Sequence, residues 1–506
     1  MDRMLEHPVR GNENLCVGRS VSMTTEGKAI SIGSVAMRAE GRTVSRSLAE
    51  IGEEKTPRRS WGPNLDQEEE ITEAVRAEER SSCSSWVVEM KKLLEDTNPP
   101  VEMVRWKRRC IYRVPEYIKK ETNSDAYRPQ FVSLGPLHHG EPHLQPMEVH
   151  KRRAMLHLVK WTGKPIEQFI TAIEDVVDEL QDAYDDLDDE WRGEKKGRFV
   201  EMMVTDGCFL LELMRIDPTK EHTGYEANDP VFSRRSYLNL WRAIRDDMIA
   251  MENQVPLVVL QRILAQFSTS LSARRINFGV QLLLNMYVEE GMDNLGLHFL
   301  DIYHRSYCGT TPTPFSKQPV KYEPRTLSAV ELSEAGIEFK KSNGDGIHDL
   351  EFENSVLSMP LLKFYDETEK ILLNLMAFER QNPDAEYHLA SYISFVDKII
   401  ESERDVALLR SKGIILNMTG SDKKVAEMFN TLTKLAKTPA IGSKLGHVQY
   451  ELNDHWRKRR NKWRASFMNN YLSSPWMFIS LVAAVVLLAA TLLQTVYAIV
   501  PFYTKG

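Results

Sequence analysis

Hydrophobic and polar residues are distributed very unevenly along this chain of 506 residues. Its most apolar stretch, at 476–500, reads WMFISLVAAVVLLAATLLQTVYAIV and holds no charged side chain. A helix rises about 1.5 Å per residue and a bilayer core is about 30 Å thick, so roughly 20 apolar residues can cross it. Aromatic rings, which favour the headgroup level of a bilayer, flank the stretch at both ends. The pattern predicts a transmembrane helix from Trp476 to Val500.

Upstream of this stretch, apolar residues recur mostly at helical spacing, interrupted by charged positions. This pattern predicts a mainly α fold, a large helical body that precedes the membrane span. The expected long helices of the first part cover residues 144–161, 165–189, 194–215, 234–265 and 277–290. Those of the second part cover residues 366–380, 385–402, 404–411, 421–437 and 444–470.

The pattern changes to that of short strands after Gly336. Residues 337–341 and 348–352 are separated by Ser-Asn-Gly-Asp-Gly, a sequence that favours a turn. We therefore expect these two segments to pair as a small β-hairpin. Residues 355–359 are a candidate for a third short strand.

Composition supplies the boundaries between these parts. The first 80 residues are rich in Gly, Ser, Arg and Glu and lack any lasting periodicity, which favours a disordered arm. Four prolines and four threonines gather at 305–327, which indicates a surface linker. The predicted organisation is an arm (1–80), a first half of the helical body (81–304) with a Pro-rich loop region (111–150), the linker (305–327), a second half with the hairpin (328–470), the span (475–500) and a short tail (501–506).

Charge and cysteine usage narrow the class of protein. The net charge of −7 gives no argument for nucleic acid as a partner. The five cysteines are odd in number, far apart and never in a C-x-x-C pair. This spacing favours reduced cysteines over a disulfide framework or a zinc finger.

Basic residues give the predicted span a direction. Only Lys505 follows the span, whereas six basic residues precede it, and cytosolic flanks carry the excess of Lys and Arg. The N-terminal residues lack the apolar segment after a basic start that would predict a secretory signal peptide. We therefore expect a single-pass protein whose body lies in the cytosol, in the plasma membrane rather than in a thinner internal one. The six residues are Arg457, Lys458, Arg459, Arg460, Lys462 and Arg464.

Candidate chemistry is sparse. The sequence contains no G-x-S-x-G, P-loop, G-x-G-x-x-G or H-E-x-x-H motif, so no catalytic, cofactor or metal residue is predicted. The acidic run at 182–190 lacks the register of a calcium loop, which favours a solvated helix face. The amides of Asn253 and Gln254, next to Pro256, are expected to satisfy backbone groups rather than to catalyse.

The loop region 111–150 carries the densest polar candidates. Its histidines can be metal ligands or loop residues bonded to backbone, and adjacent histidines rarely point to one centre, which favours the second reading. If the protein is an enzyme, this is where we expect its site. The candidate residues there are Tyr112, Arg113, His138 and His139.

Several long blocks resemble a family. IYRVPEYIKKETNSDAYRPQFVSLGPLHHG (111–140), DDMIAMENQVPLVVL (246–260) and SMPLLKFYDETEKILLNLMAFE (358–379) are similar to the plant family called domain of unknown function 247, or uncharacterised protein family 0481. The resemblance covers about residues 105–503. It implies a helical body with a C-terminal membrane span, an unassigned molecular activity and, from some grass members, a part in self/non-self recognition of pollen.

Two functional hypotheses follow from these observations. The first is a membrane-tethered recognition or scaffold protein with an unknown protein partner, which rests on the resemblance and on the lack of catalytic motifs. The alternative is an enzyme of unrecognised type that uses the 111–150 loop region.

Overall fold

The computed structural model describes residues 86–92, 94, 99–216, 224–268, 272–286, 292–309, 327–344, 346–383, 385, 387–437, 443–458 and 475–503. Contacts divide the chain into a unit of His7–Glu102 and a second unit that includes Met103–Gly506. The predicted arm, most of the predicted linker and the basic residues at 459–464 lie outside the described residues. Apart from the first turn of α2, everything below concerns the second unit.

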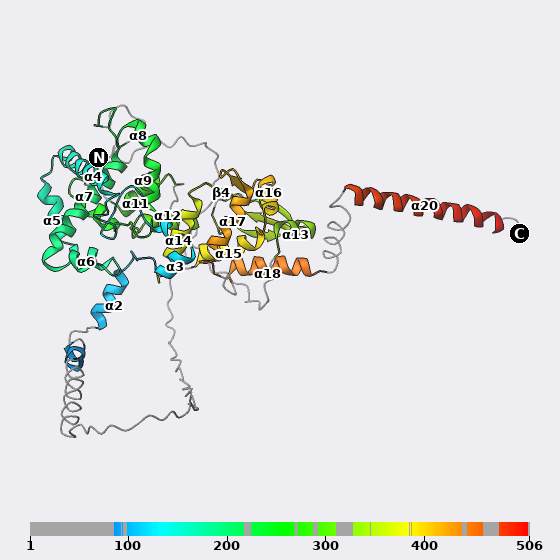
Figure 1. Cartoon of the computed structure of the whole chain (residues 1–506), viewed down its shortest axis with the longest axis horizontal. Helices are drawn as coiled ribbons and strands as arrows, with labels where there is room; N and C mark the ends of the chain where they lie inside the picture. Colours follow the sequence, from blue (N-terminus) through cyan, green and yellow to red (C-terminus); the bar gives the residue numbers. More distant parts are fainter. Residues whose placement is uncertain are drawn as a thin grey trace, which may run out of the picture. The chain divides into compact units, whose positions relative to one another are not determined.

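The prediction of a mainly α fold with small strands is confirmed, and Figure 1 shows the helices in order. Helix α7 is the core of the first half, because α4, α5 and α10 pack against it. Gly207 makes the α10 contact close: a Cβ there would lie 2.6 Å from side-chain atoms of Val259 and Ile263. The helices of this half are α2 (Pro99–Arg108), α3 (Glu116–Glu121), α4 (Gln145–Thr162), α5 (Ile166–Glu174), α6 (Val177–Asp182), α7 (Lys196–Arg215), α8 (Arg234–Asn239), α9 (Trp241–Met248), α10 (Leu257–Ala265), α11 (Ala273–Leu283) and α12 (Phe299–Cys308).

Two long helices expected from the sequence are interrupted. The stretch 165–189 ends its helices at Asp182, because the chain then pairs with residues near Ile111: the Asp185 N–H donates to the Ile111 carbonyl at 2.8 Å. The stretch 234–265 is divided into α8, α9 and α10, with a turn at 249–256 before Pro256. In both places tertiary contacts override a pattern that is helical by itself.

The second half of the body holds two small sheets. Strand β3 (Val356–Met359) lies between β1 (Glu338–Lys341), which runs parallel to it, and β2 (Glu351–Glu353), which runs antiparallel. The predicted pairing of 337–341 with 348–352 is therefore wrong, since the hairpin joins β2 to β3. The expected third strand at 355–359 is confirmed as β3. The other sheet pairs β4 (Leu362–Phe364) with β5 (Ile415–Asn417) in parallel.

Helices surround these sheets and join them to the first half. In helix α14, the buried Asn374 accepts from the Met251 N–H at 2.7 Å and donates to the Ala126 carbonyl at 2.7 Å. One amide thus bonds backbone groups from two separate segments of the first half. The helices of the second half are α13 (Ala329–Glu334), α14 (Thr368–Gln381), α15 (His388–Ile399), α16 (Glu403–Ser411), α17 (Asp422–Leu432) and α18 (Lys444–Arg457).

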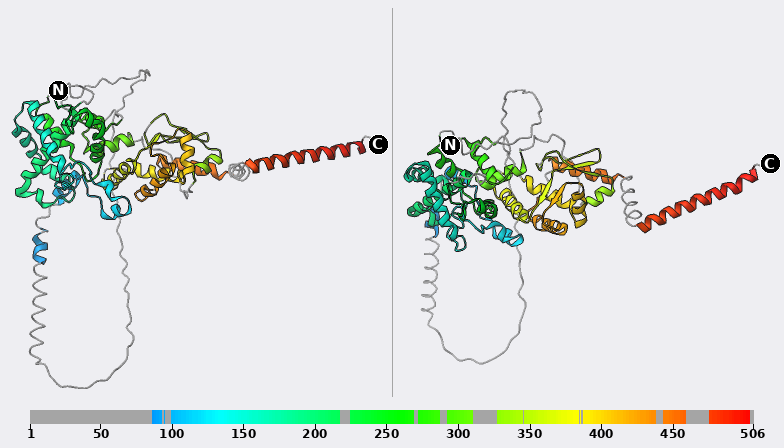
Figure 2. Two further views of the ribbon diagram at one scale, coloured as in Figure 1. Left: turned by 45° about the horizontal axis from the view of Figure 1, so that its top comes forward. Right: turned by 90° about the horizontal axis from the view of Figure 1, so that it is seen from above.

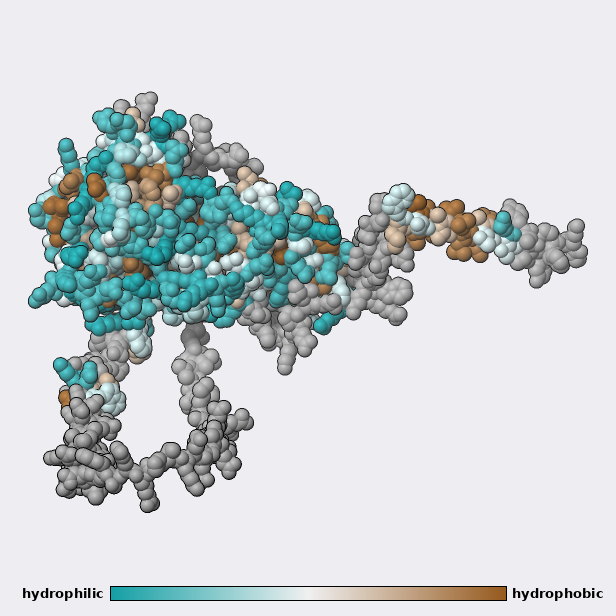
Figure 3. Space-filling view, viewed as in Figure 1, coloured by the Kyte–Doolittle hydropathy of each residue, from teal (hydrophilic) through white to brown (hydrophobic). Residues whose placement is uncertain are grey.

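The apolar C-terminal stretch forms one helix, α20 (Pro475–Tyr503), which is continuous in both views of Figure 2. The segment Trp476–Val496 has a mean hydropathy of 2.5, and none of its residues is buried in the fold. By length and composition this helix can cross a membrane. Figure 3 shows hydrophobic surface along the middle of this helix, with paler and more hydrophilic residues toward its ends.

Candidate functional site

The loop at 128–135, inside the Pro-rich region, is held by side chains rather than by a helix or a sheet. The Asp247 carboxylate accepts from three consecutive backbone N–H groups: those of Gln130 at 2.9 Å, Phe131 at 2.6 Å and Val132 at 2.9 Å. Burial raises the pKa of Asp247, although these three donors and Lys370 favour its ionised form. This carboxylate therefore accepts the backbone hydrogen bonds that a neighbouring strand would accept in a sheet.

The next residues of the loop are captured in the same way. The Leu134 N–H donates to Asn253 at 2.7 Å, and the amide of Asn253 donates to the Val132 carbonyl at 2.9 Å. The Gly135 N–H donates to Asp206, whose other carboxylate oxygen lies 2.6 Å from the Lys151 ammonium. The side chains of Asp206, Lys151 and Asn253 are buried, so this polar core is closed to solvent.

The turn after α9 supplies Asn253 and a second buried amide, Gln254. Gln254 donates to the carbonyls of Met248 and Ala250, both at 2.7 Å, and accepts from the Leu300 N–H at 3.0 Å. The amides at 253–254 bond backbone groups at 132–134, 247–250 and 300, and none of these bonds is to a group that Pro256 itself frees. Each donor and acceptor that these amides bring into the core has a backbone partner, which offsets the cost of burying them.

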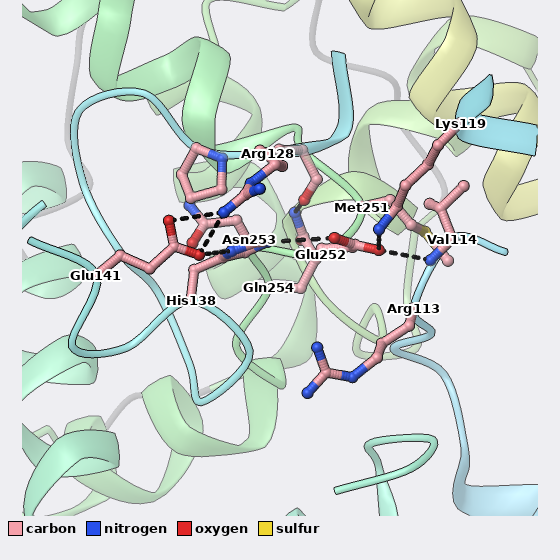
Figure 4. A network of polar contacts seen from close by, with 12 residues as sticks. Arg113, Val114, Lys119, Arg128, His138, Glu141, Met251, Glu252, Asn253 and Gln254 are labelled. Atoms are coloured by element: carbon pink, nitrogen blue, oxygen red, sulfur yellow. Dashed lines mark hydrogen bonds and ion pairs between the residues drawn. The ribbon is translucent and has the colours of Figure 1, made fainter. Parts of the chain in front are cut away.

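His138 lies between two carboxylates, as Figure 4 shows. Its Nδ1 is 2.6 Å from Oε1 of Glu141, and its Nε2 is 3.3 Å from Oε2 of Glu252. Both nitrogens can donate at once only when the ring carries its second proton.

The two carboxylates are also held by cations. Arg128 contacts both oxygens of Glu141 at 2.9 Å, whereas the Lys119 ammonium is 2.9 Å from Glu252. The Val114 N–H also donates to Glu252, at 2.7 Å. Burial opposes ionisation, but these donors hold the pKa of Glu141 and of Glu252 below its ordinary value. His138, Glu141, Glu252, Arg128 and Lys119 are called the His138 network below.

Of the four candidate residues predicted from sequence, only His138 belongs to this network. The Tyr112 hydroxyl donates to the Arg109 carbonyl at 2.8 Å, and Arg113 pairs with Asp188 at 2.9 Å on the surface. His139 packs its ring edge-on to Trp191, with 5.4 Å between centroids. The four side chains therefore do not converge on one centre.

The acidic run after α6 faces arginines. Asp182 lies 3.3 Å from Arg108, and Asp185 lies 2.9 Å from Arg109. Guanidinium groups thus contact carboxylates that a calcium ion would need.

Similarity to known proteins identifies the family. Residues 111–490 match the family DUF247, described as plant protein of unknown function. The chain belongs to this family. UPF0481 protein At3g47200 of Arabidopsis thaliana is 30% identical over 426 residues, 78% of this chain and 87% of that protein. Putative UPF0481 protein At3g02645 of the same plant is 28% identical over 183 residues, 35% of this chain and 34% of that protein. No solved structure matches significantly.

The resemblance predicted from the sequence blocks is thus confirmed, and the DUF247 match includes both the captured loop and the segment 246–256 that holds it. Sequence reasoning placed His138 in the loop. It did not identify Asp247 as the acceptor that holds the loop backbone, nor Glu252 and Lys119 as members of the His138 network. One signal was present: DDMIAMENQVP puts charged and amide side chains among apolar ones just before a proline. Polar residues inside an otherwise apolar stretch indicate buried groups that need partners.

Proposed function

We propose that this DUF247 protein is a membrane-anchored recognition or scaffold protein, with α20 as its anchor and the helical body as its binding part. The observation that carries the proposal is the exposure of α20: Leu487 is 68% exposed and Leu488 is 62% exposed. Water disfavours such a surface by about 25 cal/mol per Å² of apolar area, and a bilayer removes that cost.

The orientation follows from charge. Arg457 ends α18 and Lys458 follows it, and the chain between them and Pro475 carries four more basic residues. The positive-inside rule then puts the body in the cytosol, where the basic flank attracts anionic headgroups at about 1 kcal/mol per residue. The length of the helix suits the plasma membrane.

A binding role is supported by how the body uses its polar groups. In the loop region, the carboxylates and amides described above bond the chain's own backbone or its own cations. That arrangement builds a fixed surface and leaves the recognition of a partner to exposed residues. It favours the scaffold hypothesis over the enzyme hypothesis, which rests on the same loop.

Orientation and anchoring are tested on the full chain in plant cells. A glycosylation acceptor placed after Gly506 should be modified, and the protein should resist alkaline extraction from membranes. An unmodified acceptor on a membrane-inserted chain would overturn the orientation, and a fully extractable chain would overturn the anchor. A fluorescent fusion then shows whether the plasma membrane is the site.

The recognition role is tested by cross-linking and affinity capture from native membranes. We expect a protein partner whose capture saturates and whose binding to the purified full chain can be reproduced. A chain with His138→Ala, which alters the loop but not the surface, should keep the partner if it remains folded. Failure to find any saturable partner contradicts the proposal.

A further inference from the structure

A different cluster of side chains lies between α12 and α14. His304 and Cys308 are one helical turn apart on α12, and Glu379 faces them from α14. Nε2 of His304 is 2.8 Å from Oε1 of Glu379 and 3.4 Å from Sγ of Cys308. All three side chains are buried, and their donor atoms lie within 4.8 Å of one another.

The two partners of His304 approach the same nitrogen. In a Cys-His-acid relay the imidazole uses its two nitrogens, one toward the thiol and one toward the carboxylate. Here Nε2 carries at most one proton, so it can donate to only one of them. Nitrogen, sulfur and oxygen that converge on one point have the arrangement of ligands around a cation.

The charge of the cluster points the same way. Glu379 has no exposed surface and accepts from the N–H groups of Leu389 at 2.8 Å and Ala390 at 2.9 Å, at the start of α15. Metal-bound carboxylates are oriented by such second contacts. A divalent ion with one carboxylate, one thiolate and one neutral imidazole gives a site with no net charge, which a buried position favours.

We propose that His304, Cys308 and Glu379 bind one divalent transition-metal ion of the zinc type. Mixed nitrogen and sulfur donors select zinc over calcium or magnesium. Zinc bonds of about 2.0 Å to nitrogen and 2.3 Å to sulfur, at a tetrahedral angle, separate these two atoms by about 3.5 Å. The observed 3.4 Å between His304 and Cys308 fits that value, whereas Glu379 has to move outward by roughly 0.5 Å to ligate.

Such an ion would have a structural effect on the body. α12 reaches Cys308, four residues into the predicted linker, which is therefore helical at its start, and α14 belongs to the second half. An ion bound from both helices fixes them against each other, since the free energy of metal binding adds to the free energy of folding.

The test is metal analysis of the purified full chain. We expect about one zinc per chain in the wild type, and a loss of most of it in Cys308→Ser and in Glu379→Gln. The matched control is Cys208→Ser, another buried cysteine, on α7, which should keep its zinc. A folded wild type with less than about a tenth of a zinc per chain, and no uptake of added zinc, overturns the proposal.

A second measurement decides the matter if the Cys308 variant does not fold. Wild type stripped with a chelator is titrated with Co²⁺, which reports thiolate ligation through a charge-transfer absorption band. A saturable band that zinc removes, together with a fall in the melting temperature after stripping, supports the site. The absence of that band in folded protein refutes it.

Discussion

The loop at 128–135 and the helix α20 differ in backbone regularity and in burial. The irregular element is partly buried, and the regular one is exposed. The loop lacks a regular ladder of hydrogen bonds, yet Val132, Ser133 and Leu134 are at most 2% exposed. The helix satisfies its own backbone and consists mostly of apolar residues, yet Leu487, Leu488, Leu492 and Leu493 are each more than half exposed. The irregular backbone of residues 132–134 is inside, and the apolar helix is outside.

The difference shows what each environment has to supply. Irregular backbone can be buried only where other groups bond its N–H and C=O groups, and Asp247, Asn253, Asp206 and Lys151 do so here. An apolar helix can stay outside a core only where something other than water covers it. The fold therefore supplies the bonding partners of the loop, whereas none of the described residues buries the surface of α20.

The largest effect is expected from charge in the middle of α20. In the double variant Leu487→Arg and Leu488→Arg, each arginine near the centre of a span costs about 2.5–3.5 kcal/mol. The full chain should move from the membrane fraction to the soluble fraction, as measured by flotation with vesicles. The control is Leu156→Arg on α4, a leucine of similar exposure (60%), which should leave the distribution unchanged.

An equal response to the two changes would break the comparison. If Leu156→Arg released the chain as well, exposed leucines on α4 would also contact the membrane. If the α20 variant stayed bound, the anchor would lie elsewhere in the chain.

The next effect tests the loop. Asp247→Ala removes the acceptor of three N–H groups, and a buried unsatisfied group costs about 1–3 kcal/mol. Since Gln130 lies at the surface and can turn to water, we expect a loss of about 2–4 kcal/mol in the free energy of unfolding, measured with urea. Asp247→Asn keeps one acceptor oxygen and should lose less. If both variants lost only a negligible part of the free energy of unfolding, the loop would not depend on Asp247.

The sequence predicts the local elements of this molecule better than its long-range contacts. The α4 and α7 helices and α20 were predictable, because helical periodicity and apolar length are local. The β1–β3 pairing was not, since a Gly-rich turn favours the nearest strand and a parallel partner lies beyond it. Nor were the supports of the loop: Asp247 is 115 residues from Val132, and nothing local couples them.

The candidate site follows the same division. His138 was identified by its loop, whereas its partner Glu252 lies in another segment and only the fold brings the two together. Candidates chosen for polar density alone, such as Arg113 and Tyr112, bond nearby surface or backbone groups instead. Polar residues that are close together in the sequence therefore need not converge on one site in the fold.

A smaller effect comes from Glu252→Gln, which keeps the shape of the side chain but removes its charge. The variant should lose about 1–2 kcal/mol at neutral pH, because Lys119 and His138 face a neutral group. Since the folded pKa of Glu252 lies below its ordinary 4.5, its contribution is present above that value and is lost as the pH falls through the folded pKa. The stability difference from wild type should therefore shrink in acid. A difference that is constant from pH 7 to pH 3 would contradict an ionic role.

The last effect has the opposite sign and concerns the neighbour of Asp247. Burial, together with the charge of Glu367, raises the pKa of Asp246 to about 6. A carboxyl group with a raised folded pKa stabilises the fold below its unfolded value of 3.8, and this contribution is lost as the pH rises through about 6. Asp246→Asn should therefore stabilise the protein by roughly 1–2 kcal/mol at pH 7 and by almost nothing near pH 4, measured by urea unfolding at both values. The two adjacent carboxylates then sharpen the comparison, because burial is tolerated at Asp247 through three N–H donors that Asp246 does not share. Destabilisation by Asp246→Asn at pH 7 would mean that Asp246 also accepts stabilising hydrogen bonds in the fold, so that hydrogen bonding would not distinguish Asp246 from Asp247.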